Sequence, residues 1–329
     1  MKKTSLFILL ILLIIFSVQG KILAVDVWII IDKLSLTELT NTATENIDFL
    51  QENGAFGLVN VRTAGSIETR STYLSIGSGD RCLGSDSSHV GRKIEGVIKN
   101  NEINLLKNIN STNYYNPHIG FIGDICKQNN KLIAVIGNTD NFRKKKRTIF
   151  SMVIENNREK KIGKKGGNLL KKTDSLQRYQ SNWEKIKKEF LRYKNKADII
   201  FIETGDLTRI SDVRDKFSDE VFNNLKSQSL TKIDNFISFL IDNIKLKESR
   251  IGIVVPTPPQ KSLNKEKKLS WILISGPNID NGWLYSSSTR NTGILTLNDL
   301  ALIISGVAGI DNNYQINLSN IQNSVNSIS

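Results

Sequence analysis

The sequence predicts an α/β fold: a three-layer α/β/α sandwich around a mostly parallel sheet. Short apolar runs rich in Val and Ile recur along the chain, amphipathic stretches with helical spacing lie between them, and 39% of the 329 residues are hydrophobic. The apolar runs are continuous rather than alternating, which is typical of strands that helices cover on both faces. The hydrophobic content excludes a wholly disordered chain, and the length suits one large domain or two ordinary ones.

The chain begins with a segment that has the pattern of a secretory signal. Lys2 and Lys3 precede an apolar run over residues 6–18. This run is short for a bilayer span of roughly 20 residues, so residues 1–20 are expected to be a signal peptide or an N-terminal anchor. The prediction is an extracytoplasmic protein, either secreted or attached to the membrane by this segment, and whether the segment is cleaved stays open.

Strands and helices are expected to alternate after this leader. The predicted strands are residues 25–31, 56–61, 132–136, 199–202, 251–255 and 271–274. The predicted helices are residues 36–53 with Gly54 as the stop, 182–196, a long segment within 213–244, and 297–307 with Asn298 or Asp299 as N-cap. These elements form one core domain over residues 21–310, followed by a peripheral tail, rich in Asn and Ser, over residues 311–329.

Positive charge is concentrated in one part of the chain. The net charge is +13, and residues 143–196, called here the basic segment, hold 19 basic and 5 acidic residues. We interpret the basic segment as an insertion in the core domain. Its densest run, formed by Arg143, Lys144, Lys145, Lys146 and Arg147, could bind an anionic polymer or lipid of the cell envelope, or it could be a solvated surface. An exported protein does not meet the genome, so no nucleic-acid partner is expected.

Polar side chains follow the predicted strands, which is where ligands of α/β folds bind. Asp32 closes the first strand and could bind a cation or cap the next helix. Thr69 and Ser71 lie where a helix starts, so their hydroxyls would face its positive end or serve as N-caps. Glu203 and Asp206 follow the strand 199–202.

Four arginines lie near predicted strand or helix ends: Arg70, Arg81, Arg209 and Arg290. A guanidinium group binds an oxyanion through two parallel hydrogen bonds, so these are candidate oxyanion-binding residues. The alternative for Arg209 is a local ion pair with Glu203 or Asp206.

The order of these landmarks resembles the alkaline phosphatase-like superfamily, which includes phosphatases, sulfatases and cofactor-independent phosphoglycerate mutases. The resemblance covers most of the chain after the leader. It rests on the first strand ending in Asp32, the hydroxyl-rich helix start before SIGSG at 75–79, and the closing ILTLNDLALIISGVAGI at 294–310. The chain looks closest to an exported bacterial branch of that superfamily.

The resemblance implies a site in which two metal ions, held by Asp and His, activate a hydroxyl nucleophile. Carried over, Asp32 would be a metal ligand, Thr69 the nucleophile with Ser71 second, and Glu203 or Asp206 the later carboxylate. The chain departs from this pattern, because its two histidines, His89 and His118, lie away from the family's ligand positions. The strand 251–255 runs into a Pro-Thr-Pro sequence where an Asp-His pair is expected.

Three functional hypotheses remain. The first is an exported alkaline phosphatase-like protein without ordinary two-metal catalysis, acting at the cell envelope. The second is a metal-dependent hydrolase of phosphate or sulfate esters with a rearranged site, which as an all-oxygen site would favour Mg²⁺, Mn²⁺ or Ca²⁺ over Zn²⁺. The third is a polyanion-binding envelope protein that acts through the basic segment. Whether Cys82 and Cys126 pair stays open.

Overall fold

The computed structural model describes residues 24–86, 92–94, 97–99, 103–154, 161–164, 169–264, 268–286, 288–307 and 318–319. The leader 1–20, His89 and all of the tail 311–329 except 318–319 lie outside the described residues. Within this described part, no helix is long and apolar enough to cross a membrane.

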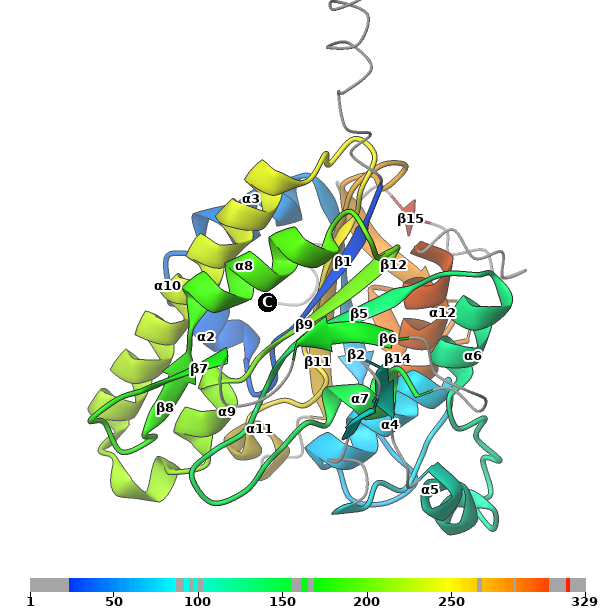
Figure 1. Ribbon diagram of the computed structural model, residues 1–329, viewed down its shortest axis with the longest axis horizontal. Coiled ribbons are helices and arrows are strands. Elements are labelled where there is room, and N and C mark those ends of the chain that lie inside the picture. Colours follow the sequence, from blue (N-terminus) through cyan, green and yellow to red (C-terminus); the bar gives the residue numbers. More distant parts are fainter. Residues whose placement is uncertain are drawn as a thin grey trace, which may run out of the picture.

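A mixed, mostly parallel sheet runs through the middle of the molecule (Figure 1). Its strand order is β13 (Asn291–Thr292), β12 (Gly282–Ser286), β2 (Gly54–Asn60), β11 (Leu269–Ser275), β10 (Ile251–Val254), β1 (Asp26–Ile30), β9 (Ile199–Thr204), β5 (Ile133–Asn138) and β6 (Lys161–Lys164). β14 (Ile294–Thr296) pairs with β2, and β15 (Leu318–Ser319) pairs with β12. The four neighbouring strands β10, β1, β9 and β5 are parallel, so their carboxyl ends meet at one edge of the sheet.

Helices cover both faces of the sheet, which gives three layers and confirms the α/β prediction (Figure 1). One face carries α3 (Glu45–Glu52), α8 (Trp183–Tyr193) and α10 (Asp219–Asn243), together with the shorter α2 (Leu36–Thr40) and α9 (Asp206–Ser211). The other carries α4 (Thr69–Ser78), α6 (Phe121–Gln128), α7 (Ile149–Met152) and α12 (Leu297–Val307). Each face buries its own hydrophobic cluster, with Ile29 in one cluster and Trp28 in the other, because successive strand residues point to opposite faces.

The remaining elements are short. They are α5 (Ile103–Asn110), α11 (Gln260–Asn264), the 3₁₀ helix η3 (Arg214–Lys216), and two small sheets formed by β3 (Arg92–Ile94) with β4 (Val97–Lys99) and by β7 (Leu170–Lys172) with β8 (Tyr179–Ser181).

The single helix expected over residues 36–53 is two helices, α2 and α3, so that prediction is wrong. Ser35 and Glu38 form a capping box that starts α2, which ends after Thr40. The start of α3 is held from α10, because the Asp234 carboxylate accepts hydrogen bonds from the main-chain N–H groups of Asn46 and Ile47. Satisfying these N–H groups with a distant carboxylate stabilises a second helix start where the sequence shows one continuous pattern.

The predicted N-cap of the last helix is also corrected. α12 begins at Leu297, and Asp299 lies in its first turn, where its carboxylate accepts hydrogen bonds from the main-chain N–H and the hydroxyl of Thr296. Thr296 therefore precedes the helix, and Asp299 reaches back to it as the third residue of a capping box does.

The basic segment is built into the fold. It contains β6, which pairs in parallel with β5 at the edge of the central sheet. It also contains α8, whose Ile186 and Phe190 are buried in the core. Its positive charge therefore lies on elements whose apolar side chains help to form the domain.

Candidate active site

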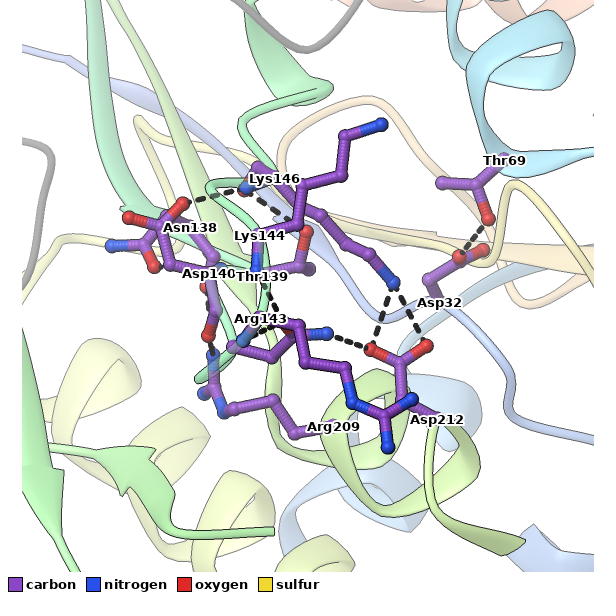
Figure 2. Close-up of polar contacts among 11 residues, drawn as sticks. Asp32, Thr69, Asn138, Thr139, Asp140, Arg143, Lys144, Lys146, Arg209 and Asp212 are labelled. Atoms are coloured by element: carbon purple, nitrogen blue, oxygen red, sulfur yellow. Dashed lines mark hydrogen bonds and ion pairs between the residues drawn. The ribbon is translucent and has the colours of Figure 1, made fainter. Parts of the chain in front are cut away.

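Asp32, the residue two positions after β1, joins three segments at the carboxyl edge of the parallel strands. Its side chain is 1% exposed. Oδ2 accepts a hydrogen bond of 2.8 Å from the Thr69 hydroxyl, and Oδ1 accepts one of 2.9 Å from the main-chain N–H of Thr257 (Figure 2 shows the first). The pKa of Asp32 is raised above its ordinary value by burial, which outweighs the lowering effects of the Lys33 charge and these hydrogen bonds.

The helix α4 supplies the hydroxyl side of this arrangement. Thr69 is its first residue, so the Thr69 hydroxyl lies at the positive end of a ten-residue helix. One turn later, the Thr72 hydroxyl lies 2.7 Å from that of Thr257, which follows β10. The hydroxyl pair and the Asp32 hydrogen bonds fix the start of α4 against the ends of β1 and β10.

Glu203 is the second buried carboxyl group at this edge. It lies on β9 directly beside Ile30 of β1 and is 1% exposed, and within the described part of the chain neither of its oxygens has a hydrogen-bond partner. Its pKa is raised well above the ordinary value, first by burial and then by the charges of Asp32 and Asp140. Burial and the neighbouring carboxyl groups therefore favour the protonated form of Glu203.

Tyr73 and Thr257 are two parts of the site that sequence reasoning missed. Tyr73 lies on α4 and is fully buried in the hydrophobic cluster on that face of the sheet. Its hydroxyl lies close enough to Glu203 to lower the pKa of that carboxyl group, although the two groups do not form a hydrogen bond of standard geometry. Helical spacing could have found it, because Tyr73 is four residues after Thr69 and so lies on the same side of α4.

The structure gives Asp206, Ser71 and Arg209 other partners. Asp206 accepts hydrogen bonds from the Ser181 main-chain N–H at 2.8 Å and from Arg209 at 2.9 Å. Ser71 Oγ accepts a hydrogen bond from the main-chain N–H of Gly84. Arg209 is 1% exposed and also donates to the main-chain carbonyls of Asn138 and Asp140. Thus Arg209 forms the local ion pair with Asp206, and these three residues have clear structural roles.

The remaining predicted arginines lie in separate places. Arg70 follows Thr69 and forms ion pairs with Glu68 and Asp86. Arg81 donates to the Tyr115 hydroxyl and lies over its ring. Arg290 is exposed in a turn with a φ of 56°. Of these three arginines, Arg70 lies at the start of α4, next to Thr69.

The run 143–147 is a fixed loop beside this edge (Figure 2). The Asn141 side chain accepts hydrogen bonds from the main-chain N–H groups of Arg143 and Lys144, as in an Asx turn, and Thr139 donates from its main-chain N–H to the carbonyl of Lys146. Three of its cations are paired with acids: Lys144 with Asp86, Lys146 with Asp212, and Arg147 with Asp140.

The side chains fit one hard cation better than a pair of zinc ions. Among the residues that the structure describes, no three His, Cys, Asp or Glu side chains are grouped so as to hold a metal ion. His118, which was not expected to be a ligand, lies 2.8 Å from Asp124 of α6. Asp32, Glu203 and the Thr69 hydroxyl could serve a Mg²⁺ or Mn²⁺ ion that keeps several waters, and the partnerless Glu203 oxygens are the observation that fits such an ion.

The two cysteines are both buried, and they lie in different hydrophobic clusters. Cys82 lies in a small cluster with Leu106 and Ile119, whereas Cys126 lies in the core under α4. Burial raises the pKa of the Cys82 thiol to about 12, so this thiol is not set up as a nucleophile at neutral pH.

Comparison with known proteins rests on structure. No protein-family model matches the chain, and no curated protein matches its sequence. The fold is similar to a protein in the alkaline phosphatase superfamily from Vibrio parahaemolyticus, with a TM-score of 0.54, 11% identity, and coverage of 88% of this chain and 67% of that chain. It is also similar to the lipoteichoic acid synthase LtaP from Listeria monocytogenes (TM-score 0.50, 13% identity, 90% and 75%) and to the alkaline phosphatase from the Antarctic bacterium TAB5 (TM-score 0.50, 9% identity, 87% and 98%).

Proposed function

We propose that this chain, whose fold is that of the alkaline phosphatase-like superfamily, is an exported protein of the cell envelope that does not carry out ordinary two-metal hydrolysis. The observation that carries the proposal is the state of the two carboxyl groups at the sheet edge. Asp32 has both oxygens engaged by Thr69 and Thr257, and Glu203 has a pKa raised well above its ordinary range.

The number of ligands supports this proposal. Two neighbouring zinc ions need roughly four ligands each, most of them His or carboxylate in a hydrolytic site. The whole chain has two histidines, and the segment after β10 presents Thr257 rather than an Asp-His pair. A set made of Asp32, Glu203 and Thr69 falls well short of that requirement.

A second candidate function is ester hydrolysis with one hard cation. The hydrogen bond from Thr69 to Asp32 favours it, because an ionised Asp32 is placed to accept the proton of a Thr69 hydroxyl that attacks phosphorus or sulfur. A Mg²⁺ or Mn²⁺ ion held by Asp32 and Glu203 would supply Lewis acidity at the ester oxygens. The protein's own part would be to hold Thr69 at the positive end of α4 and to exclude water around Glu203.

The two candidates are separated by turnover and by metal stoichiometry. Purified protein without residues 1–20 is assayed on aryl phosphate and aryl sulfate esters with Mg²⁺, Mn²⁺ and Zn²⁺, beside Thr69→Ala, Thr69→Ser and Asp32→Ala. The proposal expects the same background rate from all four proteins and fewer than two metal ions bound per chain. Turnover that Thr69→Ala and Asp32→Ala both abolish, or two tightly bound zinc ions, would contradict it.

Location is tested separately. We expect the full chain to be found outside the cytoplasm when cells that produce it are fractionated, and a chain without residues 1–20 to stay inside. The proposal of envelope action fails if both proteins stay in the cytoplasm.

A further inference from the structure

We infer that the loop of the basic segment and Arg209 form a second site, which binds a tetrahedral oxyanion such as phosphate or sulfate. The site is a cavity of about 260 Å³ between the loop after β5 and the end of α9. Figure 2 shows side chains of these two segments together with Asp32 and Thr69 of the carboxyl edge. The walls of the cavity include the cations Arg143, Lys144, Lys146 and Arg209, and Asp212 is the carboxylate that lines it. The inference does not rest on the proposed function.

The cavity is short of negative charge. Lys144 has Asp86 as its partner and Arg209 has Asp206, while Lys146 donates to both oxygens of Asp212 at 2.8 Å. For Arg143, no carboxylate within ion-pair distance is found in the described part of the chain; its guanidinium lies over the Phe142 ring, 5.0 Å from the centroid. Arg143 thus brings a cation to the cavity without a counter-charge.

Arg209 provides the second, independent observation. Its side chain is 1% exposed, yet its buried Nε–H has no hydrogen-bond partner among the described residues, while its two terminal nitrogens are engaged. A buried guanidinium N–H without an acceptor is unfavourable, because it has lost its hydrogen bonds to water. An oxyanion in the cavity that Arg209 lines would place negative charge close to this buried guanidinium and so stabilise it.

The size and the chemistry of the cavity select the ligand class. Its volume lies below the roughly 300–1,000 Å³ of sites for drug-sized molecules and well above the roughly 30 Å³ of one water. Guanidinium forks match the oxygens of a phosphate or sulfate group in pairs. The loop that carries Arg143 and Lys146 is held by its own hydrogen bonds to Asn141, Thr139 and Asp140, so the donors are positioned before a ligand arrives.

Asp212 is the built-in competitor for this site. Its carboxylate takes the Lys146 ammonium and accepts a hydrogen bond of 2.6 Å from the Asn141 amide. An incoming oxyanion must share Lys146 with Asp212 and lies near its negative charge. Neutralising Asp212 should therefore strengthen anion binding, whereas neutralising Arg143 should weaken it. These opposite effects on affinity are specific to this site.

The test is calorimetric titration of the protein lacking residues 1–20 at pH 7 and fixed ionic strength with inorganic phosphate, inorganic sulfate and polyphosphate. Arg143→Gln should weaken binding about ten-fold and Asp212→Asn should tighten it about ten-fold. The control that should bind as the wild type does is Lys172→Gln, which removes an exposed charge of the basic segment outside the cavity. Thr69→Ala, which alters the carboxyl edge, is measured beside it to locate the bound ion. Circular dichroism checks that all variants fold.

The three ligands separate the source of the oxyanion. If polyphosphate binds more tightly than free phosphate and sulfate, with the same dependence on Arg143, the natural ligand is an oxyanion group carried on a polymer. If free phosphate or sulfate binds as tightly as polyphosphate, the natural ligand is a free ion. Equal weakening by Arg143→Gln and Lys172→Gln would overturn the inference in favour of diffuse electrostatics. Loss of binding in Thr69→Ala would overturn it by placing the ion at the carboxyl edge, and because turnover is measured separately, failure here leaves the proposed function untouched.

Discussion

The Thr69 hydroxyl donates a hydrogen bond of 2.8 Å to Oδ2 of Asp32 and so ties the first residue of α4 to the end of β1. The two residues are far apart in the sequence, and the hydrogen bond holds the start of α4 against the carboxyl edge of the sheet. A carboxylate that is 1% exposed gains most from such a donor, because it has little water to replace it.

Removing the Thr69 hydroxyl should therefore destabilise the fold. Thr69→Val is expected to lower the free energy of unfolding by roughly 1–3 kcal/mol, since Asp32 loses a donor at a buried oxygen. Thr69→Ser keeps the hydroxyl and should cost less. Urea unfolding at pH 7 measures both, and an equal loss in the two variants would mean that the hydroxyl contributes nothing.

Glu203 predicts a fall in stability as the pH rises. The folded protein keeps this proton well above pH 4.5, whereas the unfolded chain releases it near pH 4.5, so the free energy of unfolding decreases with rising pH in that window. Glu203→Gln cannot ionise in either state, so it should lose less stability as the pH rises above 4.5. The difference is at most about 1.4 kcal/mol per pH unit, and identical pH slopes would show that Glu203 is ionised in the fold.

Asp26 predicts a similar effect that stops near neutrality. It lies at the opposite edge of the sheet, where burial raises its pKa to about 7 against the lowering effects of Arg250 and Lys131. Its contribution to stability should fall from about pH 4 to pH 7 and then level off. Asp26→Asn should flatten this part of the curve, and the exposed Asp242→Asn, as control, should leave it unchanged.

Gly252 predicts a steric limit in the centre of the sheet. It lies directly beside Trp28 in the β1–β10 register, and a Cβ placed on Gly252 would lie 2.1 Å from Cζ3 of the Trp28 ring. Gly252→Ala should cost at least about 1–3 kcal/mol, because Trp28 is fully buried and cannot move away.

A steric clash with Trp28 is the cause of the lost stability if a smaller ring at position 28 reduces the cost of Gly252→Ala. In the Trp28→Phe background, Gly252→Ala should cost clearly less than in the wild type, as measured by urea unfolding of the four proteins of the cycle. Equal costs in the two backgrounds would point to a backbone effect instead.

The sequence predicted the strands better than their directions. The runs at 25–31, 199–202 and 251–255 are continuous and apolar, so they identified β1, β9 and β10 within one or two residues. β11 has the same kind of run and is antiparallel to both neighbours. A strand buried on both faces has the same apolar pattern in either direction, so periodicity could not separate these cases.

The candidate site was predicted in part. Asp32 and Thr69 were expected at a strand end and a helix start, and the structure brings them into contact. The partners of the cations were not predictable, because Asp86 and Asp212, which pair with Lys144 and Lys146, are distant in the sequence. Such pairs form only when separate loops meet in the folded chain, so the local sequence around each lysine does not indicate its partner.

The position of β1 has a consequence for how the chain folds. This strand comes near the start of the sequence, yet its two neighbours are β9 at 199–204 and β10 at 251–254. During synthesis the apolar strand must wait until most of the chain has been made before either partner exists. Folding is therefore expected to be slow and dominated by long-range contacts, with the β1 segment unpaired at least until residues 199–204 have been made.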